Sequence, residues 1–400
     1  MKDVFLVLYK LINTCFSCQN RDKEQKLKTG MMGGYLRTRT GSWTQRRAQR
    51  PLVREDFNET VGITRELPDK IARKLMSRGV VEAVASKVAE AAVAVFTKIK
   101  KDNSKDGFDR KAPSTESMFR LTDAEFDVLA DAVYANREAL SSWYDACSKN
   151  KDKDKKVEID PKVKSAILKF ASVGGATSPE CALYGRFLPD TDLSGMTVTG
   201  AVETAHMFGC NELVLIRDYF VAMDDVTGKT GCGNDHQDLS SDLMNGFECI
   251  NLGQAVRNQG GTKRLLELVE SAVRAYALAQ PGAKKTSTGE RGLPILLRAV
   301  ITPLPISATD AFENPIVPIN GLTRSAIGAG RLFAHAERAY LGYGRKGVKL
   351  DAYYWTGEPL PKGTDKGVSV QCEGLDALIK QIRNNIPLEV LAEQIKKNAV

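Results

Sequence analysis

The spacing of apolar residues changes several times along the chain, and each change predicts a different element. Residues 3–12 form a short run of β-branched, aromatic and leucine side chains without a helical period, which predicts a buried first strand. Residues 35–40 alternate, which predicts a strand with Arg37 and Arg39 on one face. Strands are also expected at 181–188 and 213–223, and an edge strand at 294–306, because that apolar segment contains prolines.

Helical spacing dominates the segment between the first strands and residue 172. It predicts long helices at 80–101 and 121–147 and a short one at 163–171, separated by charged linkers at 102–115 and 150–156. Beyond this segment, helices are expected at 199–208, 262–279, 321–343 and 375–396.

Residues 224–245 are rich in Gly, Asp and Asn, which indicates an extended hairpin with its return strand at 246–252. The overall order is β-loop-helix, then β-α-β, then α-β, with the helical segment inserted between them. This order predicts an α+β core of ferredoxin-like type. We therefore expect the core to comprise residues 1–64 and 173–400, and the helical insertion to comprise residues 65–172.

The composition narrows the class of protein. The chain has 400 residues, of which 42% are hydrophobic and 26% charged, as in ordinary globular proteins. No apolar run reaches the roughly 18 residues that a membrane helix needs, so no membrane partner is expected. The first residues lack the basic region and cleavage site of a signal peptide, so a cytoplasmic location is expected.

The positive charge is concentrated in one short stretch. Residues 21–54 hold ten basic and two acidic side chains, which accounts for the whole net charge of +8. A block of one sign is typical of a polyanion-binding surface or a disordered tail. The strand and helix patterns inside the block argue against a tail, so a nucleic-acid partner is expected.

A helix within the basic block is expected to begin at Ser42-Trp43-Thr44-Gln45. Ser followed three residues later by Gln is a capping box, and Pro51 is expected to end the helix. Arg46 and Arg50 are four residues apart and share a face, to which the helix amino terminus adds positive potential. Such a surface holds phosphates without reading bases, and the aromatic pattern of a base-stacking RRM sheet is absent.

Candidate catalytic groups are few. His206 and His335 are expected to be packed helix residues. His236 lies in the predicted hairpin near several aspartates, which could bind a divalent metal and support hydrolysis: Asp224, Asp225, Asp235 and Asp238. The favoured interpretation is an exposed hairpin whose Asp and Asn residues form turns. Nucleophile-elbow, zincin and Walker A motifs are absent, so neither enzymatic activity nor a cofactor is expected.

Cys15 and Cys18 form a lone C-x-x-C motif. A structural zinc site requires two more ligands nearby, and the C-x3-H pair Cys232 and His236 lies over 200 residues away. Reduced thiols without a metal are therefore expected.

Short blocks along almost the whole chain resemble the CasC family, the backbone subunits of type I-E CRISPR Cascade complexes. Each block is weak alone, but together they follow the order and near spacing of the family. The blocks are 17–22, 33–34, 37–39, 46–50, 182–187, 200–206, 218–225, 250–252, 281–284, 311–313 and 342–344.

The resemblance implies a right-hand-like fold: an RRM-like palm, a helical fingers insertion and a β-hairpin thumb at about 218–252. It implies that several copies polymerise along a CRISPR guide RNA (crRNA), together with other Cascade subunits, and present the guide for pairing with target DNA. The thumb of one copy is expected to fold over the guide and displace a nucleotide periodically. A metal-dependent ribonuclease that uses the hairpin aspartates, and a monomeric RNA-binding protein, are the alternatives.

The resemblance also assigns residues. It places guide contacts on basic side chains, an apolar wedge on Phe187, where the family has methionine, and thumb-base contacts on Phe220 and Val221. Trp43 stands where the family has a glutamine, and it is expected to stack instead. With the residues of the basic block, the complete set of RNA-binding candidates is Asn20, Arg21, Lys28, Arg37, Arg39, Ser42, Trp43, Arg46, Arg50, Arg186, Phe187, Phe220 and Val221.

Overall fold

The chain divides into two compact units. The computed structural model describes residues 3–59, 62–100, 113–150, 157–173, 178–188, 191–319, 321–360, 364 and 369–398. The sheet unit comprises Met1–Asp56 and Gly200–Val400, and the helical unit comprises Phe57–Thr199. The linkers expected at 102–115 and 150–156 lie mostly outside the described residues. None of the described helices is both long and apolar enough to span a bilayer.

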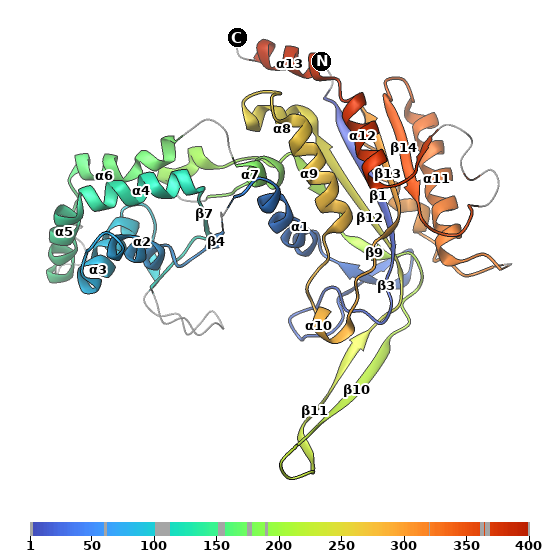
Figure 1. Cartoon of the computed structure of the whole chain (residues 1–400), viewed down its shortest axis with the longest axis horizontal. Coiled ribbons are helices and arrows are strands. Elements are labelled where there is room, and N and C mark those ends of the chain that lie inside the picture. Colours follow the sequence, from blue (N-terminus) through green and yellow to red (C-terminus); the bar gives the residue numbers. More distant parts are fainter. Residues whose placement is uncertain are drawn as a thin grey trace. The chain divides into compact units, whose positions relative to one another are not determined.

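A nine-stranded sheet forms the centre of the sheet unit (Figure 1). Strand β1 (Phe5–Asn13) pairs antiparallel with β12 (Leu243–Asn251) and with β13 (Pro294–Thr302). The strand predicted at 3–12 is confirmed. The prediction of an edge strand at 294–306 is wrong, because β13 lies between β1 and β14 (Leu350–Trp355). Pro294 is tolerated there because it occupies the first position of the strand.

The order of the sheet is β15-β14-β13-β1-β12-β9-β3-β2, and β8 also pairs with β12. The remaining strands are β2 (Thr29–Met32), β3 (Tyr35–Thr40), β8 (Val202–Thr204), β9 (Met207–Gly209), β14 (Leu350–Trp355) and β15 (Val370–Cys372). Helix α1 (Ser42–Asp56) follows β3 in the chain. Two helices, α8 (Leu252–Gln259) and α9 (Leu265–Leu278), connect β12 to β13. The central order β13-β1-β12-β8/β9, with α1 and α9 as crossovers, is ferredoxin-like, which confirms the predicted α+β fold with an RRM-like palm.

Helices cover both faces of this sheet. Helices α1, α9 and α12 (Leu375–Asn385) lie on one face, and α11 (Arg324–Tyr343) lies on the other. The side chains of β1 alternate accordingly, and Val7, Tyr9 and Leu11 belong to the same buried cluster as residues of α11. The helix predicted at 375–396 is divided at Pro387, so that α13 (Leu388–Asn398) follows α12.

Two predictions around the hairpin are wrong. The helix expected at 199–208 forms β8 and β9, because pairing with β12 buries Val202 and Met207 against the sheet. The segment at 246–252 lies in β12 up to Asn251 and is not the return strand of the hairpin. The hairpin consists of β10 (Ile216–Met223) and β11 (Thr230–Leu239), which pair from Ile216↔Leu239 to Met223↔Thr230.

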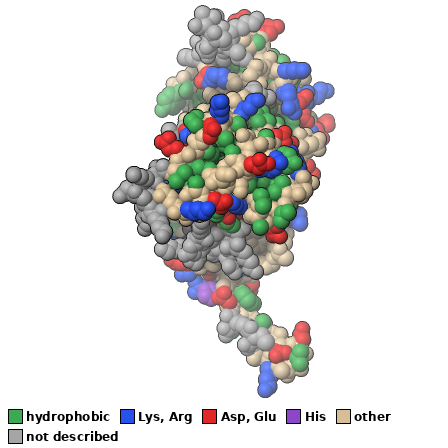
Figure 2. Space-filling view, turned by 90° about the vertical axis from the view of Figure 1, so that its left-hand side faces the viewer, with side chains coloured by type: hydrophobic (Ala, Val, Ile, Leu, Met, Phe, Trp, Pro, Cys, Tyr) green, Lys and Arg blue, Asp and Glu red, His purple; other side chains and the backbone are tan. Residues whose placement is uncertain are grey.

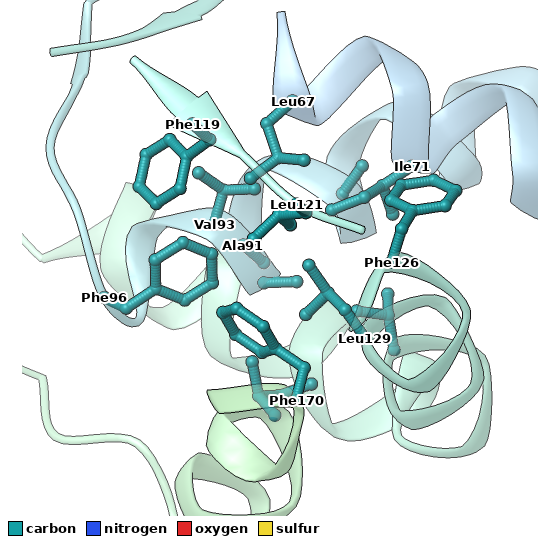
Figure 3. Packing of buried hydrophobic residues seen from close by; sticks show 14 of the residues in the cluster. Leu67, Ile71, Ala91, Val93, Phe96, Phe119, Leu121, Phe126, Leu129 and Phe170 are labelled. Atoms are coloured by element: carbon teal, nitrogen blue, oxygen red, sulfur yellow. The ribbon is translucent and has the colours of Figure 1, made fainter. Parts of the chain in front are cut away.

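The helical unit has its own core. Its longer helices are α2 (Leu67–Met76), α3 (Glu82–Ala94), α4 (Asp123–Ala135), α5 (Arg137–Lys149) and α6 (Pro161–Leu168). Figure 3 shows the rings at its centre, where Phe96 lies 5.6 Å from Phe119 and 5.5 Å from Phe170 between ring centroids. The single helix predicted at 121–147 is two helices, because Asn136 leaves helical geometry and bonds the carbonyl of Ala132.

Short elements complete the two units. They are β4 (Ile63–Thr64), β5 (Ile99–Lys100), β6 (Ser114–Thr115), β7 (Phe119–Arg120), η2 (Lys169–Ser172), α7 (Pro179–Tyr184), η3 (Thr191–Met196), α10 (Lys285–Thr288) and η4 (Thr309–Phe312).

The segment expected to be a strand at 181–188 begins within helix α7, which ends at Tyr184, and belongs to the helical unit. Ser178 accepts a hydrogen bond from the backbone N–H of Cys181, and Pro179 occupies the first turn. The buried carboxylate of Glu180 pairs with Arg120 of the same unit. These contacts explain why the helical unit extends beyond the insertion expected at 65–172.

The surface of the helical unit mixes both signs of charge (Figure 2). Lys74 pairs with Asp127 at 3.1 Å, and Lys87 pairs with Asp145 at 2.6 Å. Interspersed pairs of this kind are typical of a solvated surface. The one-sign basic block at residues 21–54 lies in the sheet unit instead.

Candidate nucleic-acid interface

The loop before β2 is fixed by backbone hydrogen bonds. The N–H of Lys28 donates to the carbonyl of Asn20 at 2.9 Å, and the N–H of Arg39 donates to the carbonyl of Lys28 at 2.9 Å. A β-bridge joins Arg21 and Leu27 within the loop. Arg21 is therefore an exposed side chain whose backbone is fixed by pairing within the loop, and Lys28 lies beside β3.

A small hydrophobic cluster ties this loop to the base of the hairpin. Cys18, Leu27 and Leu239 are buried together, and Leu213 and Ile216 pack against them. Because Ile216 begins β10 and Leu239 ends β11, the loop and the hairpin base share a core. The basic loop and the hairpin are thus adjacent in the fold.

Lys284 joins the basic surface from a distant part of the sequence. Burial raises the pKa of the Cys18 thiol, while the positive charges of Arg21 and Lys284 lower it, which places both cations near Cys18. Lys284 immediately precedes α10 and has a positive φ of 53°. It lies outside the set of predicted site residues, because no spacing in the sequence connects it with Arg21.

Arg39 is held beside His206. Its Nε donates to the carbonyl of Thr29 at 3.2 Å, and its Nη1 lies 3.2 Å from Nδ1 of His206. Loss of hydration lowers the pKa of His206, and the charges of Arg39 and Lys28 lower it further. His206 is exposed on the β8–β9 connection, so the expectation of a packed helix residue is wrong.

The start of α1 is anchored to the sheet through its first residues. The side chain of Asn20 accepts a hydrogen bond from the N–H of Gly41 at 3.0 Å. Gln45 Nε2 donates to the carbonyls of Thr40 at 3.3 Å and Ala205 at 2.8 Å. Gln45 Oε1 has no hydrogen-bond partner among the described residues, so the predicted capping box is absent. The glutamine attaches the helix to the β8–β9 connection instead.

Helix α1 also continues beyond the predicted stop. Pro51 lies inside the helix, which ends at Asp56. Pro51 removes one backbone hydrogen bond, but the burial of Gln49 and Val53 against the sheet unit holds the last turns in place. The helix therefore presents a longer basic side than the sequence indicated.

The basic side of α1 carries predicted contact residues. Arg46 is half-buried, and its Nε and Nη2 donate to Thr204 Oγ1 and to the carbonyl of Val202, both at 3.1 Å. Arg50 follows one turn later and is also half-buried. Trp43 is 88% exposed and leaves an aromatic face open at the start of the helix.

Arg37 is not available to a nucleic acid, contrary to the prediction. It is 1% exposed, and its guanidinium donates to four carbonyl oxygens, at 2.8–3.2 Å, of Gly209, Cys210, Phe312 and Glu313. Arg37 and Arg39 were expected to share a face of β3. Only Arg39 reaches the surface, because the segment at 309–313 covers Arg37.

Arg186 is likewise a structural residue. It is 9% exposed and forms an ion pair with Glu125 at 2.9 Å. Its Nε donates to the carbonyl of Met196 at 2.8 Å. The prediction of an RNA contact is therefore wrong for this side chain. It fixes the segment after α7 within the helical unit.

Phe187 follows Arg186 and points outward. Its side chain is 75% exposed, so within its own unit the ring is not buried. The anchored arginine before it explains how an apolar ring is held at the surface.

The hairpin β10–β11 presents apolar side chains along β10. Tyr219 is 64% exposed, Phe220 47% and Val221 40%. Because these side chains are so exposed, this part of β10 does not contribute to the core of the sheet unit. Phe220 and Val221 therefore have the exposure that a contact residue requires.

The hairpin aspartates do not gather around a common point. Asp224 accepts hydrogen bonds from the N–H groups of Val226 and Thr227, which makes the hairpin turn. Asp238 pairs with Arg217 at 3.2 Å, at the base of the hairpin. Within the described residues, no three His, Cys, Asp or Glu side chains are grouped as a metal ion would require. Cys15 and Cys18 are free thiols, one exposed and one buried.

The sheet unit thus combines an RRM-like fold with a basic surface made by a loop, a strand and a helix. The fold of the chain is shared with chains of two solved complexes. A chain of a "CRISPR RNA-guided surveillance complex, pre-nicking" superposes with a TM-score of 0.80 at 24% identity, over 95% of this chain and 99% of that chain. A chain of a "CRISPR RNA-guided surveillance complex" superposes with a TM-score of 0.71 at 22% identity, over 95% and 99%.

The Cas_CT1975 family of CT1975-like proteins matches residues 6–380, so the chain belongs to this family. No curated protein matches the chain.

Proposed function

We propose that the protein is a guide-RNA-binding backbone subunit of a type I-E Cascade-like CRISPR complex. The observation that carries the proposal is the basic surface of the sheet unit. It brings together Asn20, Arg21, Lys28, Arg39, Ser42, Trp43, Arg46 and Arg50 from three consecutive segments. The family match and the fold shared with subunits of surveillance complexes support the same proposal.

Phosphate binding is the chemistry that this surface supports. Guanidinium and ammonium groups on a fixed backbone contact phosphates of any sequence. The exposed ring of Trp43 can stack on a base without sequence preference. A guide of variable sequence requires a surface of this kind.

In the proposed complex, several copies bind along the crRNA, and the hairpin of each copy reaches its neighbour. The guide is then presented for pairing with target DNA, and other Cascade subunits complete the assembly in the cytoplasm. Phe220 and Val221 of β10, exposed in a single copy, are available to contact the guide RNA over which the hairpin folds.

Replacing both Arg46 and Arg50 with Ala tests the proposal. RNA affinity should fall for all sequences, and the slope of log affinity against log salt should decrease by about 0.7 per lost phosphate contact on a single strand. The matched control is Arg338→Ala with Lys380→Ala, which removes the same charge from α11 and α12. Binding by fluorescence anisotropy across salt concentrations, with thermal denaturation as a check on folding, measures both. An unchanged slope in the α1 variant would remove these residues from the interface.

The proposed role is non-catalytic. The dispersed hairpin aspartates support this, since two-metal or one-metal hydrolysis requires converging ligands. Purified protein incubated with labelled guide RNA and magnesium should leave the RNA intact. Magnesium-dependent cleavage that disappears in Asp224→Ala would establish the ribonuclease alternative instead.

Phe187 is proposed to be the wedge beside the displaced nucleotide. Phe187→Ala should keep the melting temperature within a few degrees, because the ring is exposed. It should weaken binding of guide and paired target, since a base–aromatic contact contributes about 1–3 kcal/mol. Phe187→Met should restore most of the affinity, because a flexible apolar side chain can occupy the same place. A large loss of melting temperature with unchanged affinity would assign the ring to packing.

A further inference from the structure

Charged side chains meet inside the sheet unit, between the sheet and helix α9. Lys10 of β1 is 5% exposed, and its Nζ donates to the carbonyl of Tyr276 at 2.8 Å and lies 4.2 Å from the centroid of that ring. Lys10 is opposite Gly246 of β12 in the register. A Cβ at Gly246 would lie 2.9 Å from Tyr276 Oη and 3.1 Å from Lys10 Cε, so a larger residue there would displace one of these side chains.

Glu248, two residues beyond Gly246 on the same face, is fully buried. Its Oε2 accepts hydrogen bonds from Gln49 Nε2 of α1 at 3.0 Å and from Thr204 Oγ1 of β8 at 3.1 Å. Thr204 is its direct cross-strand partner. The other oxygen, Oε1, has no hydrogen-bond partner in the described part of the chain.

The threonine hydroxyl connects this buried carboxylate to the basic side of α1. A hydroxyl has one proton, and Thr204 gives it to Glu248. Its lone pairs therefore face Arg46, whose Nε donates to Thr204 Oγ1 at 3.1 Å. The second bond of Arg46, from Nη2 to the carbonyl of Val202, fixes the plane of the guanidinium. Within the described residues these two bonds are the ones that Arg46 makes, so the remaining N–H groups of that plane are left for a ligand.

We propose that Glu248 and Thr204 are positioning residues for RNA binding: they hold the guanidinium of Arg46 in the orientation in which it meets a phosphate. The proposal rests on the proposed function, since it requires Arg46 to contact RNA. Neither residue needs to touch the RNA itself, because each acts through the hydrogen bond that it makes to the next.

A double-mutant cycle tests this inference. Thr204→Val removes the hydroxyl and keeps the shape, whereas Thr204→Ser keeps the hydroxyl. Both are measured in the wild type and in Arg46→Ala, with a short fluorescein-labelled RNA that accommodates one copy. Thr204→Val should lower RNA affinity about fivefold in the wild type, as expected for one lost hydrogen bond, and less than about twofold in Arg46→Ala. Thr204→Ser should bind like the wild type.

Arg47→Ala provides the matched background, because Arg47 is an exposed arginine on the same helix. There Thr204→Val should again cost about fivefold. An equal loss in the Arg46→Ala and Arg47→Ala backgrounds would overturn the inference and indicate a general loss of packing. If Arg46→Ala itself leaves RNA affinity unchanged, the proposed function loses its α1 contact. If Arg46→Ala weakens binding and Thr204→Val does not, only the positioning role fails.

A pH profile gives a second readout that packing alone would not change. Burial has the largest effect on the Glu248 carboxyl and raises its pKa to about 7, even though the hydrogen bonds from Gln49 and Thr204 and the charges of Lys10 and Arg46 act to lower it. Tyr276 and Cys249 are the other titratable groups whose pKa values the charge of Glu248 raises. Protonation of Glu248 removes the charge that holds Thr204, so wild-type affinity should decline from pH 8 to pH 6 more steeply than that of Thr204→Val. Parallel profiles would contradict the proposal.

Discussion

Replacing Arg37 with Met should destabilise the sheet unit by about 3 kcal/mol or more, although this arginine lies in the middle of the basic block. Its guanidinium is the hydrogen-bond donor for carbonyl oxygens of Gly209, Cys210, Phe312 and Glu313. Met fills the space of the aliphatic stem but leaves these buried acceptors without a donor. The loss is a large part of the roughly 5–15 kcal/mol that stabilises a domain.

Urea denaturation of Arg37→Met and of Arg39→Ala measures the difference. Arg39 lies two residues along the same strand, and its replacement should change stability by much less, because among the described residues it donates to one backbone carbonyl, that of Thr29, and otherwise lies against exposed His206. The folded fraction of Arg37→Met should retain the wild-type salt slope of RNA binding. A stable Arg37→Met protein with a reduced slope would show that the arginine reaches RNA after all.

The pair Arg37 and Arg39 illustrates what alternation along a strand can and cannot predict. The strand at 35–40 is confirmed with its bounds, because alternation is a local property. Which of its arginines meets water depends on the segment at 309–313, some 275 residues away in the chain. No periodicity within the strand contains that information.

Elements whose apolar pattern is long and regular were predicted well, including β1, α9 and α11. The segment at 199–208 was not, because its two short strands exist only by pairing with β12. Helix α7 was mistaken for a strand because its six residues are all buried and show no polar face. Short, fully buried segments do not reveal their period, and tertiary contacts decide their structure.

The candidate site was likewise predicted only in part. The charge block predicted the loop, strand and helix that carry basic side chains, since charge excess can be read residue by residue. It could not show that Arg46 is held by Thr204, nor that His206 lies beside Arg39. The family resemblance likewise could not separate exposed Phe187 from buried Arg186, which are neighbours in the sequence. Those distinctions arise from packing.

Shortening the hairpin should abolish cooperative loading onto guide RNA and leave the protein folded. The variant replaces residues 220–235 with Asn-Gly, a two-residue turn that can join the cross-strand pair Tyr219 and His236 in register. The cluster of Leu239 with Cys18 and Leu27 at the hairpin base remains intact. Because the described residues removed from β10 are exposed, the melting temperature should stay within a few degrees.

The effect on assembly should be much larger. If each hairpin contacts the next copy, its loss removes the interaction between neighbours and leaves only independent binding to RNA. Mobility-shift titration of a long guide should then show a ladder of intermediate complexes in place of an all-or-none transition. Val226→Ser changes a residue at the hairpin tip that is 94% exposed but keeps the hairpin length, and it should load like the wild type. Cooperative loading by the shortened protein would place the contact between copies elsewhere, and an unfolded variant would make the hairpin part of the core of the sheet unit.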